Sequence, residues 1–302
     1  MRRTLQSVTE ELTRLKRAGI RTVSIAPDSL LRLQAAVKNY VASHKTKPLE
    51  QMVDPKSQSR ENRENLAGSS SVGNSARLFP DPPKITLPDG EKALRWEFLR
   101  DLVLRDETCR KHVGANKQVV FGVGNINAGI MFVGEAPGAE EEMQGEPFVG
   151  PAGILLTKMI AAMGLTREDV YIGNIMNWRP QMQLNASGEQ IGNRPPTDEE
   201  MNYCLPYLRA QIEVIDPQVV VALGATAARG LLANQAFGTL GEVRGKWHEF
   251  EHKPLMITYH PSYILRSQSN RSKRLIWEDL LQVMDRSGLP ISDKQRGYFL
   301  GG

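Results

Sequence analysis

Between residues 92 and 290, the chain alternates short apolar runs with longer stretches whose apolar residues recur at helical spacing. The short runs predict strands at 119–121, 130–133, 170–174, 219–223 and 255–258. The longer stretches predict helices at 93–105, 154–163, 197–215, 225–232 and 272–284. Thr197, with Glu200 three residues later, has the pattern of a capping box at one helix start. Strands alternating with helices predict an α/β fold, a three-layer α/β/α sandwich with a central, mostly parallel sheet.

The chain ahead of residue 92 has a different character. Leucine and valine at helical spacing in 1–43 predict a small helical segment, with a strand-like piece at 22–25, and we assign this segment no role. Residues 44–91 are rich in Lys, Glu, Ser, Asn and Pro, which predicts a polar, disordered linker. A plain tether is the preferred interpretation, and binding of a partner there is the alternative. The domain proper is expected at 92–290.

Composition narrows the classes of protein to consider. No apolar run approaches the ~18 residues of a membrane span, and Met1–Ser7 does not resemble a secretory signal, so we expect no membrane anchor. With 2 cysteines, a disulfide framework is excluded, and we expect a cytoplasmic protein. The formal net charge of +4 is compatible with a nucleic-acid ligand but does not indicate one.

The loop after the strand at 130–133 is the most informative segment. It is dense in glycine, proline and carboxylate, and a helix follows it. Gly134 and Gly138 allow the backbone to approach a ligand closely, and Pro137 stiffens the turn. Glu135 adds a charge that a loop at a sheet edge does not need for folding. We therefore expect the chemistry of this protein to lie in this loop.

Three predicted strands end in polar side chains. The strand at 130–133 leads to Glu135, the next ends at Asn174, and the last leads to His260 and Ser262. Because the carboxyl ends of parallel strands share one edge of a sheet, we expect these residues to converge on one crevice. A carboxylate, a carboxamide, an imidazole and a hydroxyl together suit the recognition of a planar polar ring.

Motifs in the same order resemble those of the family 4 uracil-DNA glycosylases. They lie at 134–138 with Glu141, and at 145–153, 171–174, 178–180, 193–195, 224, 244–245 and 260–266. The similarity covers about 110–285 and leaves the first hundred residues unexplained. It implies an enzyme of base-excision repair that flips deoxyuridine out of DNA and hydrolyses its N-glycosidic bond. No motif supplies a lysine nucleophile, so a monofunctional glycosylase is expected.

The resemblance assigns three residues to the base. Asn174 matches the asparagine that reads the uracil edge, because its amide can donate to O4 and accept from N3–H. Phe148 matches the aromatic residue that stacks on the extruded base, although an apolar core position is the simpler alternative. His260 matches the histidine that donates to uracil O2, with a hydrogen-bonded core histidine as its alternative. The turn expected to line the base site consists of Ala136, Pro137 and Gly138.

The resemblance also assigns residues to water and to DNA. Glu135 matches the carboxylate that positions or activates the attacking water, and Glu141 is a second candidate. A solvated carboxylate is the alternative for both. Ser262 and Arg266 are expected near the DNA phosphates. The basic residues that follow are expected there too, unless they only begin a solvated helix: Arg271, Lys273 and Arg274.

One departure from the family pattern concerns a cofactor. Many family 4 enzymes hold a four-iron, four-sulfur cluster with four cysteines, and here only Cys109 and Cys204 remain, at the first and fourth positions. His112 and Trp178 replace the second and third, and 181–192 is longer than the corresponding family loop. We therefore expect no cofactor and no [4Fe-4S] cluster, and we expect Trp178 and its neighbours to pack into the space that the cluster would occupy. Another metal at Cys109, His112 and Cys204 would need a fourth ligand that the sequence does not identify.

Two alternatives to a uracil-DNA glycosylase stay open. One is a related glycosylase with shifted base specificity, for hypoxanthine or xanthine, and the other is a non-catalytic DNA-binding module on the same fold. Intact Glu135, Asn174 and His260 argue against the module. The expected partner is uracil-containing DNA, single- or double-stranded. We expect a monomer, with 1–91 as a candidate contact for a repair or replication protein.

Overall fold

The computed structural model describes residues 79–185, 188–232 and 237–300, all within the compact unit Val72–Gly302. The helical segment predicted at 1–43, and the linker predicted from residue 44 as far as residue 78, lie outside the described residues. Their assignments stay predictions. In the described part of the chain, no helix is both long enough and apolar enough to cross a membrane.

A six-stranded mixed sheet forms the centre of the fold, in the order β1-β3-β2-β4-β6-β5. The strands are β1 (Val123–Gly124), β2 (Ile130–Gly134), β3 (Tyr171–Asn174), β4 (Val219–Leu223), β5 (Trp247–Phe250) and β6 (Lys253–Thr258). The four inner strands are parallel, whereas β1 and β5 pair antiparallel at the two edges. The predicted α/β fold with a mostly parallel sheet is confirmed.

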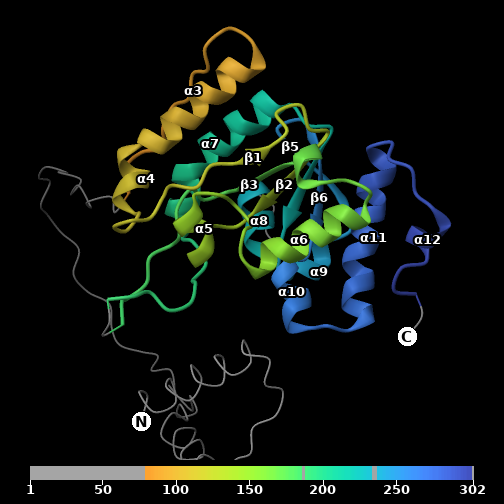
Figure 1. The fold of residues 1–302 in the computed structure, drawn as a ribbon. Coiled ribbons are helices and arrows are strands. Elements are labelled where there is room, and N and C mark those ends of the chain that lie inside the picture. Colours follow the sequence, from red (N-terminus) through yellow and green to blue (C-terminus); the bar gives the residue numbers. More distant parts are fainter. Residues whose placement is uncertain (1–78, 186–187, 233–236, 301–302) are drawn as a thin grey trace, which may run out of the picture. The chain divides into compact units, whose positions relative to one another are not determined.

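Helices cover both faces of the sheet, as Figure 1 shows. One face packs against α3 (Lys92–Arg105), α7 (Asp198–Ile215) and α8 (Ala225–Leu232). The other packs against α6 (Pro151–Ala162), α10 (Pro261–Arg266) and α11 (Asn270–Arg286). The shorter elements are α4 (Glu107–Lys111), α5 (Ala139–Gln144), the 3-10 turn Arg167–Asp169, α9 (Leu240–Val243) and α12 (Asp293–Arg296).

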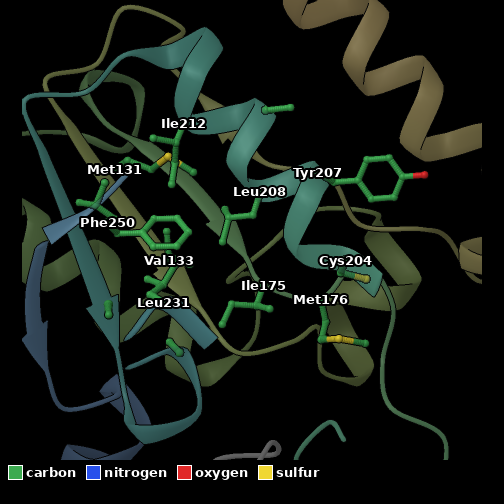
Figure 2. Packing of buried hydrophobic residues seen from close by; sticks show 14 of the residues in the cluster. Met131, Val133, Ile175, Met176, Cys204, Tyr207, Leu208, Ile212, Leu231 and Phe250 are labelled. Atoms are coloured by element: carbon green, nitrogen blue, oxygen red, sulfur yellow. The ribbon is translucent and has the colours of Figure 1, made fainter. Parts of the chain in front are cut away.

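The two cores follow from the period of two in a strand. In β2, Met131 and Val133 join the cluster under α7, while Ile130 and Phe132 join the cluster that contains residues of α6 and α11. Figure 2 shows Met131 and Val133 in the first cluster, together with Leu208 and Ile212 of α7. A strand that is buried on both faces needs a continuous apolar run, which is the pattern that made β2 and β4 predictable from the sequence.

The predicted helix boundaries agree with the structure to within a few residues. The helix expected from 154 begins instead at Pro151, because proline at the first helical position loses no hydrogen bond. The capping box at the start of α7 is confirmed. The Glu200 N–H donates to Thr197 Oγ1 at 3.2 Å, and the Thr197 N–H donates to Glu200 Oε2 at 2.8 Å.

The strand predicted at 119–121 is wrong. These residues are buried without regular structure, and the first strand begins only at Val123. Val120 pairs with one residue of the loop after β3: its N–H donates to Asn177 O at 2.8 Å, and its carbonyl accepts from Asn177 Nδ2 at 3.1 Å. The apolar run therefore reflects burial and not a strand. The sequence pattern also missed the edge strand β5, in which a single residue, Phe250, is buried.

The packed region extends beyond 92–290 on both sides. Residues 79–91 are largely irregular, but Phe79, Ile85 and Leu87 pack against the first core cluster. Beyond residue 290, Trp277 Nε1 of α11 donates to Gln295 O at 2.6 Å, and Tyr298 packs against the second cluster. Both ends of the described chain thus contribute to the same unit.

Candidate active site

A cavity of about 480 Å³ opens at the carboxyl edge of the parallel strands. Gly134 of β2 lies beside Asn174 of β3, and Leu223 of β4 lies beside Thr258 of β6, so the loops that follow these strands meet around it. The residues predicted for the base and the reaction line this cavity, together with two of those predicted for the phosphates: Glu135, Ala136, Pro137, Gly138, Glu141, Phe148, Asn174, His260, Ser262 and Arg266.

Asn174 and Phe148 both lie against the backbone of Gly134. A Cβ atom at this glycine would lie 2.5 Å from Phe148 Cζ and closer still to Asn174 Oδ1. Asn174 is buried, and no hydrogen bond engages its amide within the described residues. Both the donor and the acceptor of this carboxamide are therefore available to a ligand in the cavity.

The Phe148 ring lies beside the imidazole of His260. Their ring centroids are 5.7 Å apart and their planes are inclined by 30°. Phe148 is buried and has a φ of 55°, in the left-handed region that aromatic residues rarely adopt. Sequence analysis left a core position and a base-stacking position open for Phe148. The residue both lines the cavity and packs in the second core cluster.

The protonation of His260 follows from its surroundings. Burial lowers its pKa to about 4, and the nearby charge of Arg266 acts in the same direction, so the ring is neutral at pH 7. The Ser262 N–H donates to Nδ1 at 3.2 Å, which makes Nδ1 an acceptor. The proton of the neutral ring therefore lies on Nε2. This nitrogen has no partner among the described residues.

Ser262 and Arg266 support this arrangement. Ser262 Oγ lies 2.9 Å from His260 Nδ1, and Arg266 Nη1 donates to Ser262 Oγ at 3.3 Å. The hydroxyl can therefore accept from the guanidinium while it donates to the imidazole. Besides the phosphate contacts expected of them, both residues help to fix the tautomer of His260.

Glu135 is a half-buried carboxylate without a cationic neighbour in the described part of the chain. Burial raises its pKa above the ordinary glutamate value, and a hydrogen bond from the Thr226 side chain partly opposes this rise. Thr226 is the second residue of α8, the helix after β4, and it lines the same cavity. The site therefore contains one carboxylate that no protein cation neutralises and that can act on a cationic ligand.

Comparison with known proteins identifies the family. The model of the uracil DNA glycosylase superfamily matches residues 121–281. The chain belongs to this superfamily. It is 41% identical over 185 residues to a type-4 uracil-DNA glycosylase of Thermotoga maritima, covering 61% of this chain and 90% of that protein. It is 44% identical over 178 residues to the type-4 enzyme of Archaeoglobus fulgidus, covering 56% and 84%. The resemblance to family 4 is thus confirmed.

Glu141 has a different environment from Glu135, although both belong to the same motif of the uracil-DNA glycosylase family. Its Oε2 accepts from the Gly138 N–H at 3.0 Å, and its Oε1 accepts from the N–H groups of Val149 and Gly150 at 3.1 and 3.0 Å. Both oxygens are therefore engaged with backbone. This geometry links the start of α5 to the loop that carries Phe148, and it leaves little capacity for activating a water molecule.

Sequence analysis matched Gly224 to a family motif but gave the turn after β4 no role in the site. Leu223, Gly224, Ala225 and Thr226 line the cavity, and Gly224, with a φ of 95°, brings its backbone against His260 Cβ. The signal was present, because the run at 219–223 was predicted as a parallel strand and its carboxyl end had to share the same edge. Further lining residues that no side-chain role had singled out are Ala152, Pro180, Asn193 and Arg194.

The basic stretch at the start of α11 does not line the cavity. Arg274 donates to Glu278 Oε1 at 2.8 Å and to the carbonyl oxygens of Arg296 and Tyr298 at 2.8 and 2.9 Å. Lys273 places its ammonium 6.0 Å from the Phe299 ring. These two side chains thus fasten the C-terminal segment, and a role of Arg271 at the phosphates stays a prediction.

The two cysteines lie together in the first core cluster. Cys109 of α4 and Cys204 of α7 are buried, free thiols. Figure 2 shows Cys204 in the core near Met176. A hydrogen bond with Cys204 and burial raise the pKa of the Cys109 thiol, which favours its neutral form.

Aromatic rings fill the neighbouring space. The rings of His112 and Trp178 stack with centroids 5.0 Å apart, and Phe79 stacks on His112 at 5.2 Å. Trp178 is fully buried. Within the described residues, no three His, Cys, Asp or Glu side chains are grouped to hold a metal ion. The residues at this place therefore do not fit a four-cysteine cluster.

Proposed function

We propose that this protein is a uracil-DNA glycosylase of base-excision repair. In this function it flips deoxyuridine out of single- or double-stranded DNA and hydrolyses the N-glycosidic bond, the activity named for its type-4 relatives. One observation carries the proposal. A single cavity is lined by an unengaged carboxamide, an aromatic ring, a neutral imidazole and a carboxylate without a counter-ion.

Recognition of the base rests on Asn174 and Phe148. The Asn174 amide donates to uracil O4 and accepts from N3–H, and cytosine reverses both of these groups. A cytosine in the cavity would leave buried polar groups unpaired, at a cost of roughly 1 to 3 kcal/mol each. The Phe148 ring stacks on the face of the base, which adds affinity without distinguishing one base from another.

Bond cleavage rests on His260 and Glu135. As the bond between C1′ and N1 breaks, its electron pair moves to uracil, and Nε2–H of the neutral His260 ring donates to O2, where negative charge develops. Glu135 stabilises the cationic sugar and orients a water molecule, whose oxygen bonds to C1′. One water proton ends on the released uracil. No lysine lines the cavity among the described residues, which supports a monofunctional enzyme without β-elimination.

The other assignments follow from the surrounding contacts. Glu141 serves as a positioning residue, because its oxygens are engaged with three backbone N–H groups. Ser262 and Arg266 line the same cavity and are proposed to contact DNA phosphates as well. The protein functions without an iron–sulfur cluster, as a cytoplasmic monomer, with 1–91 as a contact for a repair or replication protein. The stacked rings of His112 and Trp178, which stand at two of the four cluster positions, support the absence of the cluster.

A strand-cleavage assay tests the proposal. The full chain is incubated with single- and double-stranded oligonucleotides that carry one uracil, followed by alkali. We expect cleavage at uracil and none at cytosine or thymine. Asn174→Ala and His260→Ala should lose at least about a hundredfold in rate, the typical share of one positioned donor. His252→Ala is the matched control, because this exposed histidine in the β5–β6 turn does not line the cavity.

Each other outcome has a distinct meaning. Cleavage at hypoxanthine or xanthine in preference to uracil would identify a glycosylase of shifted specificity. Binding of DNA without cleavage of any of these bases would identify a non-catalytic module. Full activity of both alanine variants would overturn the residue assignments. A brown, iron-containing preparation would contradict the absence of a cluster.

A further inference from the structure

Phe148 adopts a backbone conformation that its own residue type disfavours. Its φ of 55° lies in the left-handed region, where a bulky non-glycine residue is a true outlier. Such a conformation persists only if the surrounding structure over-determines it. The position of the ring that lines the cavity therefore depends on what holds the segment Pro147–Gly150.

Arg167 holds this segment through its carbonyl oxygens. Nη2 donates to Pro147 O at 3.0 Å, and Nη1 donates to Phe148 O at 3.1 Å. Arg167 begins the 3-10 turn ahead of β3, and that turn is fixed by hydrogen bonds from Thr166 to Asp169 at 2.7 and 2.9 Å. The guanidinium is planar, carries donors only and reaches two adjacent acceptors at once, so it grips the strained peptide in one orientation.

Two further contacts hold the same segment. Glu141 accepts from the N–H groups of Val149 and Gly150, so that a cation holds the carbonyls and an anion holds the amides of one turn. Gly153 of α6 leaves the room that the Phe148 carbonyl occupies, because a Cβ atom there would overlap that oxygen. Arg167 itself does not line the cavity, so any effect on a ligand is transmitted through Phe148.

We propose that Arg167 is a positioning residue for base recognition: its grip on the Pro147 and Phe148 carbonyls keeps the Phe148 ring where the extruded base stacks. This inference rests on the proposed glycosylase function and deepens it. Arg167 lies outside the motifs on which the resemblance was based, and its turn Arg167–Asp169 does not line the cavity.

Single-turnover cleavage of a uracil-containing oligonucleotide tests the role of Arg167. Arg167→Met keeps most of the side chain and removes the donors, and we expect cleavage about tenfold slower, the effect of weakening one base-stacking contact. Arg167→Lys keeps a cation that can reach a carbonyl and should recover part of the rate. Lys92→Met is the matched control, because Lys92 Nζ also donates to a carbonyl, Ile215 O at 2.9 Å, at the end of α7 and outside the cavity lining.

A double-mutant cycle separates positioning from a general loss of structure. Phe148→Ala removes the ring, so Arg167→Met should slow this variant by less than twofold if the arginine acts through Phe148. A full tenfold effect in both backgrounds would overturn the inference, as would wild-type rates for Arg167→Met. If Arg167→Met fails to fold, Arg167→Lys in both backgrounds decides by the same criterion. A wild-type protein that releases no uracil would instead refute the proposed function, and this inference with it.

Discussion

The cavity and the cysteine region are both buried, and both are assembled from segments far apart in the chain, yet they differ in what their polar groups are doing. At the cavity, the Asn174 amide and His260 Nε2 have no partner within the described residues, and Glu135 has no cation beside it. In the cysteine region, Cys109 is hydrogen-bonded to Cys204, and the rings beside them are stacked. Burial alone therefore does not make a site. A site requires functional groups that line a cavity and have no hydrogen-bond partner or counter-ion in the protein.

The same difference holds between neighbouring carboxylates. Glu135 and Glu141 belong to one motif and line one cavity, but Glu141 accepts from three backbone N–H groups while Glu135 is held by the side chain of Thr226. Glu141 therefore supports the loop, whereas Glu135 is left to act on a ligand. Position in a motif brought both residues to the site, and their hydrogen bonds separate their roles.

The largest effect that we predict concerns the stability of the cysteine region. Trp178→Ala removes a fully buried ring that stacks on His112, and it should lower the free energy of unfolding by about 3–5 kcal/mol. Denaturant unfolding measures this loss. Because no unengaged polar group of the cavity is touched, the fraction that remains folded should cleave uracil-containing DNA within about threefold of wild type. If Trp178→Ala were as stable as wild type but inactive, the cysteine region would contribute to activity, which contradicts the distinction between the two regions.

At the cavity we expect a smaller effect, which lowers activity and leaves stability nearly unchanged. In Gly134→Ala, the new Cβ would lie too close to both Phe148 and Asn174, so these side chains must move. We expect cleavage to slow by about a hundredfold, the cost of misplacing reacting groups by about 1 Å, with a much smaller change in stability. The matched control is Gly129→Ala, whose Cβ would meet only Gln218 at ordinary contact distance. Equal activity of the two variants would contradict the proposed arrangement.

Sequence reasoning predicted which residues gather at the cavity better than it predicted the structure around them. The apolar runs of β2, β3, β4 and β6 defined a parallel sheet, and in such a sheet the residues after each strand must share an edge. The position of Glu135, Asn174 and His260 around one cavity followed from that topology. The run at 119–121 shows the limit of the method, because burial beside Asn177 produces the same apolar pattern as a strand.

Roles that depend on particular hydrogen bonds were not readable from the sequence. Nothing in the spacing shows that both oxygens of Glu141 are engaged, or that Arg274 is tied to the carbonyls of Arg296 and Tyr298 instead of being left for DNA. The strained backbone of Phe148 and the grip of Arg167 are likewise properties of the folded loop. Residue type and order determine which groups meet, and three-dimensional contacts determine which of them remain unengaged.

The smallest effect that we predict is a dependence of the rate on pH, which tests the charge states of the cavity. Activity needs Glu135 ionised and His260 neutral. Because the pKa of Glu135 is raised and that of His260 is lowered to about 4, Glu135 protonates first as the pH falls. The single-turnover rate should be flat around pH 7 and should fall about tenfold once the pH is one unit below the pKa of Glu135.

The dependence of folding stability on pH provides a separate test of the charge state of His260. Its folded pKa is lowered from 6.5 to about 4, so the folded state binds fewer protons than the unfolded state between these values. The contribution of the neutral ring to stability is therefore fully present above pH 6.5 and is lost as the pH falls toward 4. His260→Gln should remove this part of the pH dependence of unfolding. Two results together would contradict this: a cleavage rate that already declines near pH 6.5, and a pH dependence of unfolding that His260→Gln leaves unchanged. They would mean that the imidazole is solvated and titrates normally. The cavity would then be an open surface and not the enclosed site that base expulsion requires.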